Sequence, residues 1–169
     1  MPDSNDHFMD WLRDAHAMEE QAEQMLTAMS ARIETYPEVK QRLDQHIQET
    51  RNQAALIAQC IQRRGGDTAT VKDLTGKAMA MMHSFTAAMA SDEIIKGSMV
   101  SYAFEHFEIA SYKSLIVAAE VAGDTETQRV CQAILVEEEA MAKWLADNMP
   151  ILVKRFLQHA DTPGLSEKR

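Results

Sequence analysis

Four long stretches of this sequence repeat apolar residues at alternating steps of three and four. Such steps place side chains on one face of an α-helix, so each stretch predicts a helix with one buried side. Helix-breaking residues are scarce, with 6 glycines and 4 prolines among 169 residues. So few breakers argue against the many short turns of an all-β protein and favour long helices. The predicted fold class is therefore all-α.

The predicted helices span about residues 4–35, 37–64, 91–123 and 125–160. Pro37 suits the first turn of the second helix, and Gly65 favours its end. We expect Thr125 and Gln128 to form a capping box at the start of the fourth helix. Pro150 lies inside that helix, where we expect a kink or a break.

The connections between these helices are unequal in length. Tight turns join the first helix to the second and the third to the fourth, which predicts two antiparallel hairpins. About 25 residues, 66–90, separate the hairpins, and a short helix is expected at about 71–85. A long link of this kind is typical of a four-helix bundle with one crossover connection. We expect one domain over residues 1–160 and a flexible tail over residues 161–169.

Each predicted long helix carries a glutamate on or beside its apolar face. Glu19 and Glu138 interrupt the apolar rows of the first and fourth helices. Glu105 and Glu108 occupy consecutive core positions of the third helix, whereas Glu49 lies at the flank of the second. Counted from the two tight turns, these glutamates lie at matching heights to within about one helical turn. The pattern predicts one layer of carboxylates inside the bundle.

Charged groups inside a core need a counter-charge. A solvated surface position explains one such glutamate but not a matched set on four helices. Buried ion pairs are the other alternative, but Arg51 and Lys113 lie off these rows, and we find no other lysine or arginine on them near the layer. Because like-charged carboxylates cannot all stay ionised in an apolar layer, metal cations are the simplest counter-charge.

The donor set indicates the kind of metal. Five carboxylates and an imidazole suit two divalent ions, iron in the first place and manganese as the alternative. Ferritin-like bundles bind such pairs with glutamates and Glu-x-x-His motifs. Here the order is reversed, because His46 precedes Glu49 by three residues. His46 is either a ligand or a hydrogen-bonded core histidine, His16 is a weaker candidate, and Gln53 is expected to orient a carboxylate.

Four segments resemble one protein family. These are WLRDAHAMEEQAEQML, HIQETRNQ, FEHFEIASY and AILVEEE, within about residues 8–158. They are similar to the YciE/YciF-type family of small bacterial ferritin-like proteins, and closest to its YciE branch. The resemblance implies a ferritin-like bundle, a dinuclear metal centre at the matched glutamates, a homodimer and a role in bacterial stress responses. It implies no particular reaction.

Three functions are compatible with such a centre. The first is a metal-dependent oxidoreductase that acts on O2 or peroxide, because a carboxylate-bound metal pair can change redox state. The second is a structural or stress protein whose metals only stabilise the bundle. The third is iron storage, for which no residue indicates contacts of a cage.

Charge and cysteine content narrow the partners and the compartment. The net charge of −9 disfavours nucleic acids and anionic membrane surfaces as partners. Two isolated cysteines in helical segments are typical of reduced thiols. The N-terminal segment has no basic region followed by an apolar one, and we find no apolar run of about 18 residues, long enough to span a membrane. We therefore expect a cytoplasmic protein.

Overall fold

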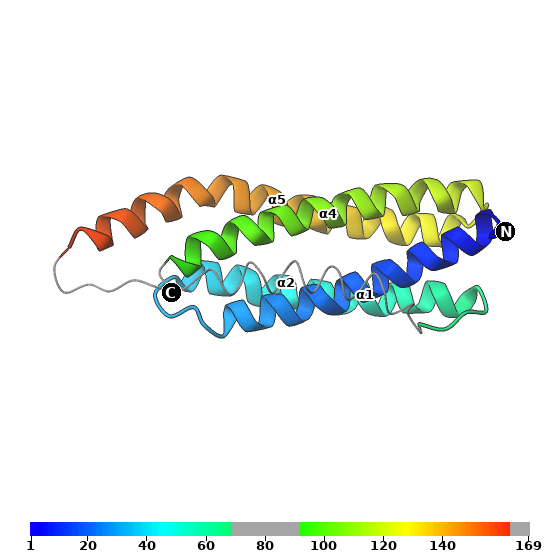
Figure 1. The fold of residues 1–169 in the computed structure, drawn as a ribbon, viewed down its shortest axis with the longest axis horizontal. Helices are drawn as coiled ribbons and strands as arrows, with labels where there is room; N and C mark the ends of the chain where they lie inside the picture. Colours follow the sequence, from blue (N-terminus) through cyan, green and yellow to red (C-terminus); the bar gives the residue numbers. More distant parts are fainter. Residues whose placement is uncertain (69–91, 163–169) are drawn as a thin grey trace.

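Four long helices lie side by side in the computed structural model, which describes residues 1–68 and 92–162 (Figure 1). They are α1 (Ser4–Ser30), α2 (Pro37–Arg63), α4 (Glu93–Val121) and α5 (Thr125–Ala160). The short helix expected at 71–85 and most of the expected tail lie outside the described residues. No strand occurs in the described ranges. The predicted all-α class is thus confirmed.

Two hairpins build the bundle. α1 packs against α2 and α4 packs against α5, while fewer contacts join α1 to α4 and α2 to α5. The chain leaves α2 at one end of the bundle and enters α4 at the other, so α2 and α4 run in parallel (Figure 1). This order requires the long crossover connection that the sequence predicted. None of the helices in the described parts of the chain is long and apolar enough to cross a membrane.

The apolar core is divided into two clusters. One cluster contains Phe8, Leu12, Ile57 and Ile134, and the other contains Leu26, Leu43, Met141 and Leu145, together with further residues. On α1 the first cluster ends at Met18 and the second begins at Met25, and on α5 the two clusters are separated between Ile134 and Met141. The intervening layer contains Glu19 and Glu138. The helices therefore hold the carboxylates between two apolar blocks.

The structure corrects two details of the fourth predicted helix. Its N-terminus is capped by Asp124, whose carboxylate accepts a hydrogen bond from the Thr127 backbone, and not by a box of Thr125 and Gln128. The helix also continues through Pro150, so the break, one of the two expected outcomes there, does not occur. Both Pro150 and Ala146 are exposed, so water can solvate the Ala146 carbonyl that lacks a helical donor.

Asp124 also joins the two hairpins and makes stability depend on pH. It forms ion pairs at 2.9 Å with Arg63 and with Arg64, at the end of α2. Burial alone would raise the pKa of Asp124, but the hydrogen bonds from Thr127 and the nearby arginines lower it from 3.8 to about 2. Because the folded-state pKa is lowered, the stabilisation is complete above about pH 4 and is lost as the pH falls through about 2.

We therefore expect Asp124→Asn to lower the free energy of unfolding by about 2 kcal/mol at pH 7. Asparagine is a good cap, so the loss reflects the missing charge. The difference from wild type should shrink below pH 4 in urea unfolding experiments. Glu126→Gln is the matched control, because Glu126 pairs with Arg63 at 3.2 Å but is 59% exposed. A difference that stayed constant down to pH 3 would contradict this explanation.

Candidate metal centre

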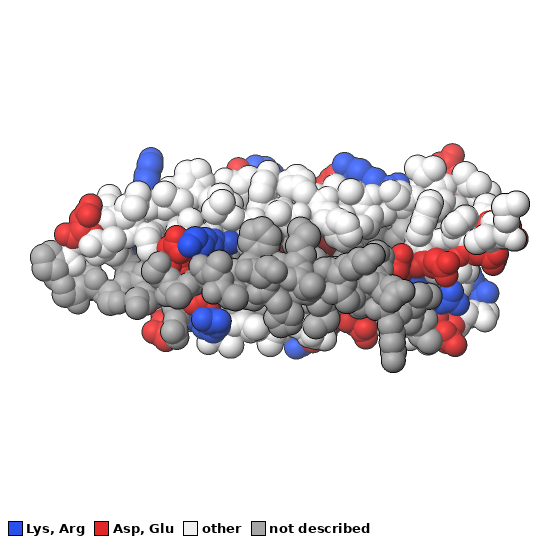
Figure 2. Space-filling model, in the orientation of Figure 1, with Lys and Arg blue, Asp and Glu red and all other residues white. Residues whose placement is uncertain are grey.

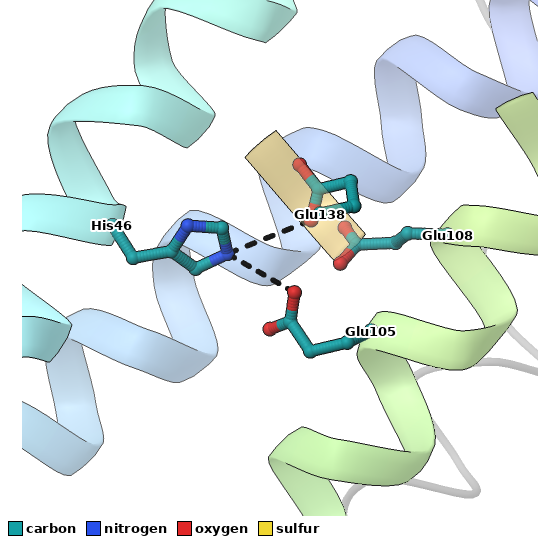
Figure 3. A group of neighbouring side chains, drawn as sticks. All are labelled: His46, Glu105, Glu108 and Glu138. Carbon is teal, nitrogen blue, oxygen red and sulfur yellow. Dashed lines mark ion pairs between the residues drawn. The ribbon is translucent and has the colours of Figure 1, made fainter. Parts of the chain in front are cut away.

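Three helices bring four buried side chains together in the layer between the two apolar clusters. They are His46 on α2, Glu105 and Glu108 on α4, and Glu138 on α5. Each offers one ligand atom, and these four atoms all lie within 4.8 Å of one another. The side chains are at most 1% exposed. Figure 3 shows the imidazole of His46 directed at the carboxylates from the opposite side.

The two ring nitrogens of His46 have different neighbours. Nδ1 lies 2.7 Å from Oε2 of Glu49, while Nε2 lies 3.2 Å from Glu105 and 3.6 Å from Glu138 (Figure 3). An ionised carboxylate only accepts hydrogen bonds, so Nδ1 carries a proton. In the neutral ring, the lone pair of Nε2 then points at the buried carboxylates. A carboxylate that fixes a histidine in this way is typical of metal sites.

Protonation of His46 supplies a counter-charge of its own. Burial lowers the pKa of His46, but its hydrogen bonds to Glu105 and Glu49 raise it, so that the pKa is about 10. In the absence of a bound cation, the imidazolium therefore balances part of the negative charge. A metal ion that takes Nε2 as a ligand must displace this proton.

Glu49 connects this centre to the protein surface. Its side chain is 20% exposed and pairs at 3.2 Å with Arg42, and Gln45 also donates a hydrogen bond to it. The hydrogen bond from His46 lowers the pKa of Glu49 most strongly, and Arg42 and Gln45 add to this effect against partial burial, so that the pKa is about 2. Glu49 is therefore ionised at neutral pH and holds His46 in place.

Glu19 adds a fourth buried carboxylate, from α1. It is 0% exposed, and the buried hydroxyl of Tyr112 donates a hydrogen bond to Oε1. Burial raises the pKa of Glu19 to about 8, although the Tyr112 hydroxyl and His46 oppose the shift. Its second oxygen, Oε2, accepts no hydrogen bond from the described residues.

The other carboxylates also favour protons over an unpaired negative charge. Burial and then the repulsion of Glu105 raise the pKa of Glu138 to about 9. Burial and the nearby Glu19 and Glu138 raise the pKa of Glu108 well above its usual value. Three helices thus place carboxyl groups where ionisation is costly unless a cation is present.

The donor atoms fit a divalent metal. Both oxygens of Glu138 and Oε2 of Glu19 are buried and accept no hydrogen bond within the described ranges. Buried polar atoms are almost always paired, so such groups need an explanation. Oxygen donors with one imidazole nitrogen suit hard or borderline divalent ions such as iron and manganese. The residues present therefore fit the metal centre that a ferritin-like bundle implies.

The predicted site residues fall into two sets. The structure brings His46, Glu105, Glu108 and Glu138 into the group of four. Glu19 and Glu49 lie outside that group, although Glu19 interacts electrostatically with Glu105 and Glu108, and Glu49 contacts His46. The prediction that Glu19, Glu105, Glu108 and Glu138 face the core is confirmed by their burial. Their role as ligands stays a prediction.

The weaker candidates differ from each other in position. Gln53 is fully buried and donates a 2.8 Å hydrogen bond to Glu137, the neighbour of Glu138. Gln53 therefore orients the carboxylate of Glu137, which is not one of the predicted site residues, and its expected role beside the metal centre stays a prediction. His16 lies apart from the group, and its nearest carboxylate is that of Glu20 at 3.8 Å.

Arg42 was missed, and it corrects the expectation that no arginine is available near the layer. It lies seven residues before Glu49, and its guanidinium reaches Glu49 with only 13% of the side chain exposed. A spacing of seven returns to the same helix face after two turns, so the pattern contained this signal. Arg42 neutralises the outer carboxylate, whereas none of the ion pairs found in the described residues joins a lysine or arginine to the four inner ones.

The fold and the buried side-chain group together define a class of protein. A bundle of two helical hairpins with a crossover, and with glutamates and a histidine facing its interior, is a ferritin-like bundle with a possible metal site. The family comparison agrees with this class, since residues 3–158 match the model described as "Domain of unknown function (DUF892)". The chain belongs to this family.

Solved structures support both the family and the fold. A protein of Xanthomonas campestris pv. campestris is 41% identical, with a TM-score of 0.81 over 94% of this chain and 99% of that one. The stress protein YciF of E. coli is 23% identical, with a TM-score of 0.79 over 91% and 99%. The resemblance to YciE/YciF-type proteins is confirmed, while the placement in the YciE branch stays a prediction.

A more distant structure confirms the ferritin-like architecture. The dodecameric thioferritin of Bacteroides fragilis, described as a bacterioferritin-related protein, has a TM-score of 0.70 over 92% of this chain and 91% of that one. At 18% identity the likeness concerns the fold alone. The all-α ferritin-like fold predicted from the sequence is therefore correct.

Proposed function

We propose that this protein binds two divalent metal ions, iron or manganese, in the carboxylate layer of its bundle. One observation carries the proposal: buried glutamates from α4 and α5 group around His46 of α2, and several carboxylate oxygens in this layer accept no hydrogen bond from the described residues. A metal pair would supply the missing counter-charge and, as iron or manganese, redox chemistry with O2 or peroxide.

The residues would have different roles in binding the metal ions. His46, Glu105, Glu108 and Glu138 would hold metal, and Glu19 would bind with the oxygen that Tyr112 leaves unpaired. Glu49 would keep the His46 proton on Nδ1 and so keep Nε2 free for metal. This role differs from the direct ligand role predicted from the sequence, and it follows from the position of Glu49 outside the group of four.

The biological setting extends this proposal. We place the protein in the bacterial cytoplasm, in a stress response and as a homodimer, as the resemblance to YciE/YciF-type proteins implies. The reduced state of Cys60 and Cys131, which are both buried and free, agrees with that compartment. In this setting the metal pair would act as an oxidoreductase centre for O2 or peroxide.

A non-catalytic role is the second candidate, and burial favours it. The side chains of the centre are at most 1% exposed, so bound metals would be enclosed by the two apolar clusters. Enclosed metals would contribute to folding free energy even without turnover.

Metal content tests the proposal directly. After anaerobic loading with Fe(II), we expect about two equivalents per chain by elemental analysis, and at least one equivalent fewer in Glu108→Ala. Glu120→Ala is the matched control, because Glu120 lies on the same helix and is exposed. Equal metal content in both variants would contradict the site. Peroxide or O2 added to the loaded protein then separates the two candidates, since repeated oxidation of Fe(II) requires the catalytic one.

A further inference from the structure

Two cysteines lie buried on one side of the carboxylate layer, and the proposed function gives neither of them a chemical role. Cys60 of α2 and Cys131 of α5 are 1% and 0% exposed, and both thiols are free. Both belong to the apolar cluster that also contains Phe8 and Ile134. A single buried thiol usually serves as a small apolar residue. Two thiols that face each other can also form a disulfide, so their relative position matters.

The contacts between α2 and α5 place the two cysteines at the same height. Gln53 donates a 2.8 Å hydrogen bond to Glu137, and Arg63 donates a 2.6 Å hydrogen bond to Thr127. These two contacts are ten residues apart on each helix, so α2 and α5 run antiparallel in a constant register. Position 60 of α2 therefore lies opposite position 130 of α5. Cys131 is one residue, about 1.5 Å, from that point.

Both cysteines also lie on the faces through which these helices contact each other. Cys60 follows Gln53 by seven residues, so it lies on the face of α2 that reaches α5. Cys131 follows Thr127 by four residues, so it lies on the face of α5 that contacts Arg63. When helix axes are about 10 Å apart, facing Cα atoms lie about 5 Å from each other. This separation is within the range that a disulfide requires.

The surroundings of the pair make direct attack by a dissolved oxidant slow. Burial raises the pKa of Cys131 to about 12, and the nearby Cys60 and Asp124 add to the shift. The thiolate is the reactive form of cysteine, and this thiol stays protonated at neutral pH. The pair is therefore better suited to give electrons to another group inside the protein than to react with molecules in solution.

The cluster that contains the cysteines adjoins the carboxylate layer. Cys131 precedes Glu138 by seven residues, so the two side chains lie about 10 Å apart along the same face of α5. Tyr112 belongs to the same cluster, and its hydroxyl donates a hydrogen bond to Glu19. Only packed side chains therefore separate the two thiols from the proposed metal centre.

We propose that Cys60 and Cys131 are the electron donor that restores the metal centre after peroxide has oxidised it. This inference rests on the proposed function. Peroxide takes two electrons from the centre, its O–O bond breaks, and its two oxygens take up two protons and leave as water. The two thiols then give up two electrons and two protons, and one S–S bond replaces two S–H bonds. In total, one peroxide and two thiols become two waters and one disulfide.

A single turnover with peroxide tests the donor. Protein loaded anaerobically with Fe(II) receives one equivalent of peroxide per chain. Mass spectrometry without reductant then follows the disulfide, and absorbance follows ferric iron. In wild type we expect a disulfide between Cys60 and Cys131 of one chain and a return of the iron to Fe(II). In metal-free protein the same disulfide should form at least tenfold more slowly, because the Cys131 thiol is enclosed and protonated.

Three variants separate the donor from the rest of the cluster. Cys60→Ala and Cys131→Ala should each bind as much iron as wild type in elemental analysis, but their iron should stay ferric and no disulfide should form within the chain. Met9→Leu is the matched control, because Met9 brings another buried sulfur to the same cluster but no thiol. It should behave like wild type. Circular dichroism should show the same helical signal in all three variants.

Three results would overturn the proposal, and they differ in what they say about the metal centre. Bound iron that peroxide makes ferric, without formation of the disulfide, would leave the centre in place and exclude the cysteines as its donor. Disulfide formation at equal rates with and without iron would show that the thiols react with peroxide directly. Protein that binds no iron would overturn the proposed function together with this inference.

Discussion

Replacing Glu138 by methionine is expected to stabilise the metal-free protein and to abolish its response to metal. Glu138 is fully buried between two apolar clusters, and neither of its oxygens accepts a hydrogen bond from the described residues. Methionine has a similar shape and no polar atom, so it fills the same space and removes the cost of burying the carboxyl group. Burying a polar group without a hydrogen bond costs about 1–3 kcal/mol in proteins, which sets the size of the expected gain.

The same change removes a ligand from the centre. In wild type, Mn(II) at 100 times its dissociation constant should add about 2.7 kcal/mol to the free energy of unfolding for each site. Glu138→Met should lose most of this gain. In chemical denaturation, the substitution should therefore raise the free energy of unfolding without Mn(II) and reduce the stabilisation that Mn(II) adds. A residue with a purely structural role would not produce both effects.

Glu139→Met is the matched control for this experiment. Glu139 is the next residue on α5, is 51% exposed and pairs with Lys113 at 3.3 Å. Exposed substitutions of this kind change stability by about 0.5 kcal/mol or less. The expectation is contradicted if metal-free Glu138→Met is less stable than wild type and Mn(II) still stabilises it to the same extent. This result would show that the carboxylate does not bind metal and that its burial does not destabilise the fold.

The inward direction of the glutamates was predictable from the sequence because spacing fixes the face of a helix. Glu19 and Glu138 each replace one apolar residue in a regular row, and Glu105 and Glu108 follow the same phase on α4. Height along the helices was predictable as well, since the rise per residue is constant. The layer of carboxylates is therefore determined by periodicity and by the positions of the two tight turns.

Side-chain contacts across helices were not predictable in this way. The sequence left open whether His46 is a ligand, because spacing gives a face but not the direction of the imidazole ring. The structure shows Nδ1 held by Glu49 and Nε2 turned inward, and Arg42 holds Glu49 in turn. These contacts depend on rotamers, on the packing of α2 against α5 and on the reach of His46 across the bundle to Glu105 of α4, which one helix pattern does not specify.

The outer side of α4 was overlooked for a related reason. On α4 the buried row contains Glu105 and Glu108, and the position of this row does not specify how apolar the opposite side of the helix is. The apolar residues on the outer side of α4 are recognised only when the exposure of each side chain is known. Phe107 and Val121, for example, are 56% and 74% exposed.

The stability of the metal-free protein is expected to fall as the pH rises from 5 to 9, whereas metal-loaded protein should keep its stability. Burial raises the pKa of Glu138 to about 9 and that of Glu19 to about 8, and contacts with Glu105 and Glu49 raise that of His46 to about 10 against the effect of burial. All three groups bind protons more tightly in the folded state than in the unfolded state.

The sign of the effect follows from proton linkage. A group whose folded-state pKa is raised contributes most below its unfolded-state pKa, about 4.5 for the glutamates and 6.5 for histidine. That contribution is lost as the pH rises through the folded-state pKa. We expect a loss on the order of 2 kcal/mol or more between pH 5 and pH 9, measured by urea unfolding in the presence of a chelator.

Metal reverses this trend because it takes the place of the protons. Binding to His46, Glu19 and Glu138 releases protons at neutral pH, so the apparent affinity for Mn(II) should rise at least tenfold per pH unit between pH 6 and pH 8. Titration calorimetry in buffers of different ionisation enthalpy measures the protons released. Glu138→Met should release at least one proton fewer than wild type, while Glu139→Met should release the same number. Metal binding without proton release would place the ions elsewhere in the protein, because His46, Glu19 and Glu138 hold their protons at neutral pH in the metal-free protein.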